Sequence, residues 1–287
     1  MINVFKKKKL FDYYMKNFKI EVNDMLEMDE EFLNLAKRKL KNGEKVSAGW
    51  LQTGSNITAE IMAKSGFDIL SIDMEHGPGD IMTLIQQLQA VSKYGVTPIA
   101  RTPWNDFVQI KKILDAGVHG VIVPYIGSKE DAENAVKACK YPTEGVRGIA
   151  PSPRAGNFGM NSMNYLKKAN EEILIFIQIE SAEGVKNIEE IVEVEGVDGV
   201  FVGPMDLATS MGYFCNPQAD EVKAAVKRIE DVVAKTNKFI GTVAGDFEGA
   251  KKLYDKGYDM VVMMSDSTSL GKLALENVNK FKESYRK

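Results

Sequence analysis

Residues Ile69-Leu-Ser-Ile-Asp-Met-Glu-His-Gly-Pro-Gly-Asp80 pass from a short apolar run into two acids, a histidine and a glycine-rich turn. An apolar run of this length is typical of a strand that is buried on both faces of a parallel sheet. Parallel α/β proteins keep their chemistry at the carboxyl ends of strands, because the strand fixes the backbone while the following loop is free to vary. The stretch therefore predicts a functional site at the end of this strand.

Seven further apolar runs accompany this one, and helical patterns separate them. Such alternation is the signature of repeated βα units with a parallel sheet. The expected strands cover residues 46–50, 69–73, 97–101, 120–124, 174–180, 199–202, 239–243 and 260–264. Eight is the number of βα units that closes a (β/α)8 TIM barrel. We therefore predict an α/β chain with a barrel domain at residues 44–287 and an N-terminal extension at residues 1–43.

A repeated glycine phrase supports this register. Gly66, Gly117, Gly196 and Gly257 each precede an apolar residue and then Asp or His, just before the second, fourth, sixth and eighth strands. Glycine takes the left-handed conformation that ends a helix, so we expect a helix to stop at each. An open doubly wound sheet would use the same phrase. Residues 128–131 resemble a capping box, which predicts the start of the fourth helix.

Composition indicates a globular protein of the cytoplasm. Of the 287 residues, 44% are apolar, and the formal net charge is -3. This charge gives no field that would attract nucleic acid or an anionic membrane, so neither is an expected partner. Cys139 and Cys215 lack the paired spacing of a disulfide framework, which favours a reducing compartment. The first residues lack the apolar stretch of a secretory signal, and no segment reaches the roughly 18 apolar residues of a spanning helix.

Polar side chains stand at the carboxyl ends of four expected strands. They are Asp73, Glu75 and His76 after the second strand, Arg101 on the third, Gln178 and Glu180 on the fifth, and Asp206 beyond the sixth. In a barrel these ends converge on one mouth. Glu180 and Asp206 are hard oxygen ligands, which suit Mg²⁺ or Mn²⁺ with water or substrate in the remaining positions. Ordinary strand-end acids are the alternative reading of this pair.

The eight apolar runs contain no lysine. Enzymes that form a Schiff base with a carbonyl substrate need a lysine inside the barrel mouth, where desolvation lowers its pKa. The sequence therefore favours a metal over an imine for any carbanion chemistry at this mouth.

Four segments, at residues 71–80, 141–148, 178–181 and 199–207, resemble the signature segments of the HpcH/HpaI aldolase family. These are metal-dependent class II aldolases that use pyruvate. The resemblance runs from about residue 44 to residue 275, with the segments in family order. It implies a TIM barrel of the phosphoenolpyruvate/pyruvate type and a homo-oligomer, a hexamer by family, in which the last helix is exchanged between subunits.

The resemblance also assigns a cofactor and its surroundings. It implies that Glu180 and Asp206 bind a divalent metal ion, which would be Mg²⁺, Mn²⁺ or Co²⁺. Gln178 lies beside the metal in the family. The substrate-binding residues that it implies are Arg101, Gln178, Gly203, Pro204 and Met205.

The catalytic residues implied by the resemblance are Arg101, His76, Asp73 and Asp115. Arg101 would hold the oxygens of pyruvate. His76, supported by Asp73, would move a proton through a metal-bound water, and Asp115 matches an acid near His76. Physically, the metal and Arg101 would stabilise the charge that develops on the enolate oxygen.

The expected reaction is the reversible cleavage of a 4-hydroxy-2-oxo acid to pyruvate and an aldehyde. Members of the family act on 2-dehydro-3-deoxyglucarate or 4-hydroxy-2-oxoheptanedioate. Met74, Gly77 and Met205 differ from the residues common in the family, which leaves the aldehyde open. One alternative is a citrate-lyase-like enzyme that acts on a CoA thioester, and another is a small-acid-binding or assembly protein built on a decayed barrel.

Several other polar residues have competing interpretations. His119 begins the fourth expected strand, at the end opposite the mouth, and is expected to be structural. Arg147 and Arg154 lie in the long segment 141–172 and could bind a distal carboxylate or form salt bridges within or between subunits. For Asp246 and Asp266, we expect helix N-caps.

Overall fold

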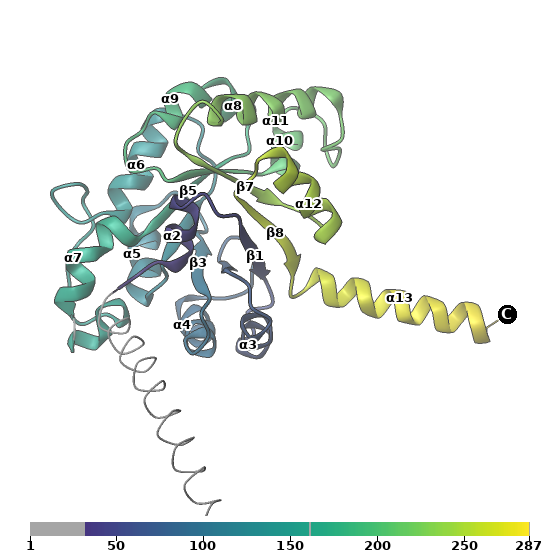
Figure 1. Cartoon of the computed structure of the whole chain (residues 1–287), viewed down its shortest axis with the longest axis horizontal. Helices are drawn as coiled ribbons and strands as arrows, with labels where there is room; N and C mark the ends of the chain where they lie inside the picture. Colours follow the sequence, from purple (N-terminus) through teal and green to yellow (C-terminus); the bar gives the residue numbers. More distant parts are fainter. Residues whose placement is uncertain (1–31, 161, 287) are drawn as a thin grey trace, which may run out of the picture.

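Eight parallel strands pair in chain order and close into one barrel (Figure 1). The computed structural model describes residues 32–160 and 162–286. The strands are β1 (Val46–Leu51), β2 (Ile69–Asp73), β3 (Thr97–Arg101), β4 (Gly120–Val123), β5 (Leu174–Ile179), β6 (Gly199–Val202), β7 (Phe239–Val243) and β8 (Met260–Ser265). β8 pairs with β1, which closes the ring. The predicted barrel is confirmed, and each strand end lies within one residue of its expected position.

Helices follow the strands and form the outer layer of the barrel (Figure 1). They are α3 (Asn56–Lys64), α4 (Ile81–Val91), α5 (Phe107–Ala116), α6 (Lys129–Cys139), η1 (Arg154–Gly159), α7 (Ser162–Glu172), α8 (Ala182–Lys186), α9 (Ile188–Val192), α10 (Pro204–Ser210), α11 (Asp220–Val233), α12 (Phe247–Lys256) and α13 (Thr268–Tyr285). In the described parts of the chain, no helix is long and apolar enough to cross a membrane.

Local signals set the ends of these helices. The predicted capping box is confirmed: the Ser128 side chain accepts from the backbone of Asp131, and the Asp131 side chain accepts from the backbone of Ser128. The four glycines of the repeated phrase have φ angles of 90° to 111°, as a left-handed helix stop requires. Gly117 and Gly257 are the C-caps of α5 and α12, and Gly66 follows the C-cap of α3. The expectation is wrong for Gly196, because α9 already ends at Val192.

Apolar side chains fill the inside of the barrel. One buried cluster includes Trp50, Phe176, Phe201 and Met260, together with side chains from the other strands. A filled interior leaves no channel through the barrel, so ligands are confined to its two ends.

Helix α2 (Leu35–Lys41) closes the end where the strands begin. Ala36 and Leu40 join the inner cluster. Lys37, 6% exposed, donates to the Ile173 carbonyl at 2.8 Å and pairs with Asp198 at 2.9 Å. The predicted extension at residues 1–43 thus ends in a helix that packs on the barrel, while residues 1–31 lie outside the described chain.

We predict that Lys37→Met destabilises the protein by about 3 kcal/mol, because the aliphatic packing stays while Asp198 loses its buried partner. Lys39→Met is the matched control, since Lys39 pairs with Asp68 on the surface with 46% of its side chain exposed. That change should cost less than about 1 kcal/mol. Urea unfolding at pH 7 measures both, and equal losses would contradict the structural role of the Lys37 pair.

Candidate active site

Arg101 is the fixed cation of the barrel mouth. Its Nε and Nη2 donate to Asp73 Oδ1 at 3.1 Å and Oδ2 at 2.7 Å, and Nε also lies 3.1 Å from Glu75 Oε2. The guanidinium stacks 4.5 Å above the Trp50 ring. Arg101 and Asp73 are 7% and 2% exposed. A bidentate pair with a stacked ring holds the planar guanidinium in one orientation.

Asp73 organises the turn after β2. Its side chain accepts from Gln52 Nε2 at 2.9 Å and from the backbone amides of Glu75 and His76. Burial by itself would raise the pKa of Asp73, but Arg101 and these donors hold that pKa below its ordinary value. Gly77 belongs to the same turn, where a Cβ would lie 2.1 Å from the Asp73 carbonyl oxygen. Asp73 is therefore an ionised anchor, not a proton carrier.

His76 stands at the edge of the mouth, with 62% of its side chain exposed. The backbone amide of His76 donates to Asp73 Oδ1 at 3.2 Å, so Asp73 contacts the backbone of His76. The carboxylate near the imidazole is that of Glu75, whose Oε2 lies 3.9 Å from His76 Nε2. Burial raises the pKa of Glu75, and the charges of Asp73 and Asp206 add to this rise while Arg101 opposes it. Glu75 is among the polar residues expected at this mouth, but no role for it was predicted from the sequence.

Glu180 is the second buried acid of the mouth, 1% exposed. It accepts from the Gln178 side chain and from the Tyr125 backbone amide, the latter at 2.9 Å. Burial raises the pKa of Glu180 to about 7, although both hydrogen bonds oppose the rise. The Glu75 and Asp206 charges contribute a smaller part of this rise. Asp206, half-buried in the first turn of α10, lies close enough for its charge to raise the pKa of both Glu75 and Glu180.

The donor chemistry of this space fits a hard divalent cation. Glu180 and Asp206 offer carboxylate oxygens, and the buried Oε1 of Gln178 has no hydrogen-bond partner. Repulsion between the acids would be relieved by a dication between them. In residues 32–160 and 162–286, no three His, Cys, Asp or Glu side chains form a metal-binding group. Water or substrate oxygens would have to complete the shell.

Gly203 lies so close to Glu180 and Gln178 that there is no room for a side chain. A Cβ there would lie 2.6 Å from Glu180 Oε2 and 3.0 Å from Gln178 Nε2. Pro204 then opens α10, and Met205, 48% exposed, reaches the surface beside Asp206. The predicted substrate-lining run thus lies next to the predicted metal ligands, and its role in binding remains a prediction.

Arg101 also lines a cavity of about 210 Å³ at this end of the barrel. Trp50 and Gln52 form one side, and residues after β7 and β8 form the other, together with Thr268 and Ser269 at the start of α13. The cavity is large enough for a small organic acid to reach Arg101.

The structure places Asp115 elsewhere. It lies in the last turn of α5, and barrel helices run opposite to their strands, so this turn is at the end away from the mouth. Its carboxylate pairs at 2.6 Å with Arg147, which is fully buried and stacks on Tyr141 and Tyr165. Within one chain, Asp115 is therefore not brought to His76, and Arg147 forms the salt bridge within the subunit that was one of its two interpretations.

The two expected helix caps differ in outcome. Asp246 accepts from the backbone of Gly249 at 2.8 Å and caps α12, as predicted. Asp266 is not the N-cap of α13, which is Ser267. Its carboxylate instead accepts from the Gln52 backbone amide at 2.8 Å and from the Thr58 hydroxyl, and so ties the end of β8 to the segment after β1.

We predict that Gly203→Ala destabilises the protein by about 1–3 kcal/mol, because the added methyl group forces Glu180 from its place in a packed site. Gly95→Ala is the control, since a Cβ at Gly95 meets nothing within 4 Å. The two free energies of unfolding are compared in urea. A Gly203 variant as stable as the Gly95 variant would show that the approach of Glu180 is not tight.

Glu180 gives a pH-dependent prediction. Its pKa is raised from 4.5 to about 7, so the folded metal-free protein binds a proton that the unfolded chain has released between those values. The ionised Glu180 carboxylate therefore destabilises the metal-free protein, and this effect is complete above about pH 7. Below about pH 4.5 the effect is absent, because Glu180 is protonated in both states. Glu180→Gln should stabilise chelator-treated protein by about 1–3 kcal/mol at pH 8 and by less than about 1 kcal/mol at pH 5.

Urea unfolding at the two pH values measures this effect. Glu183→Gln, an exposed position in the first turn of α8, is the matched control and should change neither value. An equal gain for Glu180→Gln at both pH values would contradict a raised pKa at this site.

Comparison with known proteins identifies the family of this chain. A family profile described as HpcH/HpaI aldolase/citrate lyase matches residues 47–272. A 4-hydroxy-2-oxo-heptane-1,7-dioate aldolase of Escherichia coli is 39% identical over 241 residues, which cover 84% of this chain and 92% of that protein.

Solved structures show the same relation. An HpcH/HpaI aldolase/citrate lyase family protein from Burkholderia cenocepacia has a TM-score of 0.83 at 33% identity, covering 87% of this chain and 99% of that one. Citrate synthase SbnG has a TM-score of 0.80 at 28% identity, covering 89% and 100%. The chain therefore belongs to the HpcH/HpaI aldolase/citrate lyase family and is a carbon–carbon lyase of the aldolase type.

Proposed function

We propose that the chain is a divalent-metal-dependent aldolase that reversibly cleaves a 4-hydroxy-2-oxo acid to pyruvate and an aldehyde. The observation that carries the proposal is the juxtaposition, at one barrel mouth, of a clamped guanidinium with two largely buried carboxylates, Glu75 and Glu180, whose pKa values are raised by burial and by the charge of Asp206. A keto acid needs a cation for its carboxylate and a site that favours negative charge on its keto oxygen. The name of the Escherichia coli relative supports a 4-hydroxy-2-oxo diacid as substrate.

Glu180 and Asp206 would hold the metal ion, with Gln178 beside them. When bound, the ion would supply Lewis-acid polarisation of the keto oxygen. Mg²⁺, Mn²⁺ and Co²⁺ all fit a set of oxygen donors.

Arg101 would bind the carboxylate of the keto acid. Its Nε and Nη2 are engaged by Asp73, so Nη1 is the donor left for substrate among its described hydrogen bonds. Asp73 would then act as the anchor that keeps the guanidinium aimed into the mouth. A rigid donor that does not reorganise stabilises a developing charge most effectively.

His76 would carry the proton. In the cleavage direction, Nε2 takes the proton of the 4-hydroxyl group through a bridging water, and the C3–C4 bond breaks to release the aldehyde. The proton then returns to C3 of the pyruvate enolate. Glu75, whose Oε2 lies 3.9 Å from Nε2, would orient the imidazole. It would thus take the supporting role that the family resemblance gave to Asp73 and Asp115. Asp73 would contribute by fixing the backbone of the turn.

The test is pyruvate release from a panel of 4-hydroxy-2-oxo acids, with 2-dehydro-3-deoxyglucarate and 4-hydroxy-2-oxoheptanedioate included. Chelator-treated protein should be inactive, and Mg²⁺, Mn²⁺ or Co²⁺ should restore turnover. Glu180→Gln and Asp206→Asn should each lower kcat/KM by roughly 10²–10³-fold, the size expected for one group that stabilises the transition state.

Glu183→Gln is again the matched control and should retain wild-type turnover. If Glu180→Gln and Asp206→Asn kept wild-type activity after chelation and return of the metal, neither residue would belong to the metal site.

A citrate-lyase-like activity on a CoA thioester is the second candidate. The family description includes citrate lyase, and the similar solved structure of SbnG is that of a citrate synthase. An acyl-CoA assay on the same protein distinguishes the two, because an aldolase gives no CoA-dependent turnover.

We also propose a cytoplasmic homo-oligomer, with a hexamer as the expected assembly. Helix α13 extends from the body (Figure 1) and has no buried residue. Leu270, Leu273, Leu275, Val278, Phe281 and Tyr285 are its exposed apolar side chains. An apolar helix face of this kind needs a cover, and a second subunit provides one. The free thiols of Cys139 and Cys215 support a reducing compartment.

A further inference from the structure

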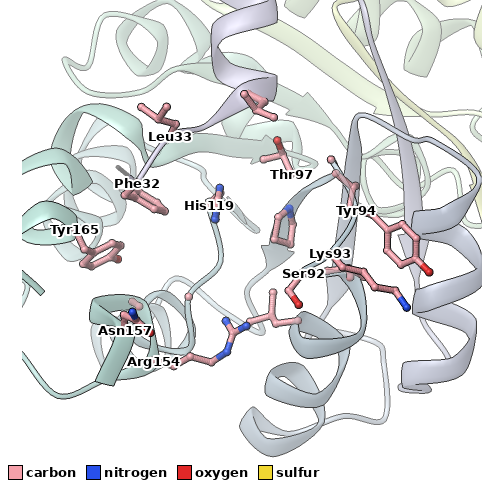
Figure 2. Close-up of a pocket in the computed structure, with 18 of the residues that line it drawn as sticks. Phe32, Leu33, Ser92, Lys93, Tyr94, Thr97, His119, Arg154, Asn157 and Tyr165 are labelled. Atoms are coloured by element: carbon pink, nitrogen blue, oxygen red, sulfur yellow. The ribbon is translucent and has the colours of Figure 1, made fainter. Parts of the chain in front are cut away.

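A second cavity, of about 420 Å³, lies at the opposite end of the barrel from the candidate active site (Figure 2). Its walls come from the end of α4 and the start of β3, from His119 just before β4, and from η1 and α7. Phe32 and Leu33 close one side. The volume is within the usual range for small-molecule sites, which is about 300–1,000 Å³.

Arg154 is the cation of this cavity, and it has no described counter-ion. Its Nη1 donates to the Ala116 carbonyl at 3.0 Å, and no carboxylate among the described residues pairs with it. Arg154 is half-buried, and this burial lowers the pKa of its guanidinium. Arg101 and Arg147, which are more deeply buried, each hold a carboxylate. A desolvated charge without a partner is unfavourable, so an anion is the group that this cavity lacks.

The other charged groups nearby are already paired or neutral. Burial and the Arg154 charge lower the pKa of His119 to about 4, while Glu172 and a hydrogen bond with the Leu33 backbone oppose this. Glu172 accepts from the Asn34 amide at 2.7 Å and is thereby occupied. Lys93 pairs with Glu60 at 2.8 Å.

The remaining walls combine apolar and aromatic side chains with polar ones. Figure 2 shows His119 and Arg154 between Tyr165 and Asn157 on one side and Ser92, Lys93 and Tyr94 on the other. The Phe32 ring meets the His119 ring edge-on at 4.7 Å, and Leu88 and Val91 add aliphatic surface. If a ligand paired its carboxylate with Arg154, an apolar remainder of the same ligand would lie against these apolar side chains.

We propose that this cavity binds a small organic carboxylate with an apolar body, at a site separate from the aldolase mouth. The carboxylate pairs with Arg154 and approaches the His119 imidazole. The proposal is independent of the aldolase reaction, since it uses none of the residues assigned to that reaction.

The test uses the full chain labelled with ¹³C at histidine Cε1, with benzoate as the probe and benzamide as its neutral isostere. The chain contains only two histidines, and His76→Gln assigns their two NMR signals. Benzoate should shift the His119 signal in a saturable manner and raise its titration midpoint by about one pH unit, because a nearby anion favours the charged imidazole. Benzamide should do neither.

Arg154→Gln should weaken the benzoate effect at least about tenfold, the loss expected when a charge-paired donor is removed. Lys93→Gln, which removes a lysine already paired on the rim, is the control and should retain it. Wild-type pyruvate release in the Arg154 variant would show that it is folded. The proposal is overturned if benzoate leaves the His119 signal unchanged, if benzamide shifts it equally, or if the shift survives in Arg154→Gln.

Discussion

Two carboxylates, Glu75 and Glu180, are largely buried at one end of the barrel, and burial is the main reason why the pKa of each is raised. Glu180 is almost fully buried, and Glu75 and Asp206 both raise its pKa. Such an arrangement is unfavourable by itself, and a folded protein retains it where function requires it. A divalent cation would convert the repulsion into attraction, which is why we place the metal there.

Hydrogen bonds and close packing hold these acidic side chains in place. Glu180 is held by Gln178 and by the Tyr125 amide, and Gly203 lets the chain pass within contact distance of it. On the other side, Asp73 fixes both Arg101 and the turn that carries His76. The buried inner cluster supports the strands that carry these residues. Preorganisation of this kind lets the donors act without rearrangement when charge develops on a substrate.

The sequence predicted the barrel well because strands buried on both faces appear as apolar runs, and because glycines mark the helix ends before three of them. It also placed Glu180 and Asp206 at one mouth, since strand ends converge in a barrel. It did not predict the role of Glu75, because strand alternation ends at Asp73 and does not fix side-chain directions in the loop. The pairing of Asp115 with Arg147 and the ties of Asp266 join residues distant in sequence, so no local pattern could reveal them.

In the proposed site, Glu180 and Asp206 would share one cation, which would also bind the keto acid. The most direct test of this arrangement is anomalous diffraction from crystals soaked with Mn²⁺ and pyruvate. The account predicts a single strong peak between the two carboxylates, with pyruvate oxygens on the ion and the pyruvate carboxylate near Arg101. A peak elsewhere, or two carboxylates turned away from each other with pyruvate absent from the mouth, would contradict it.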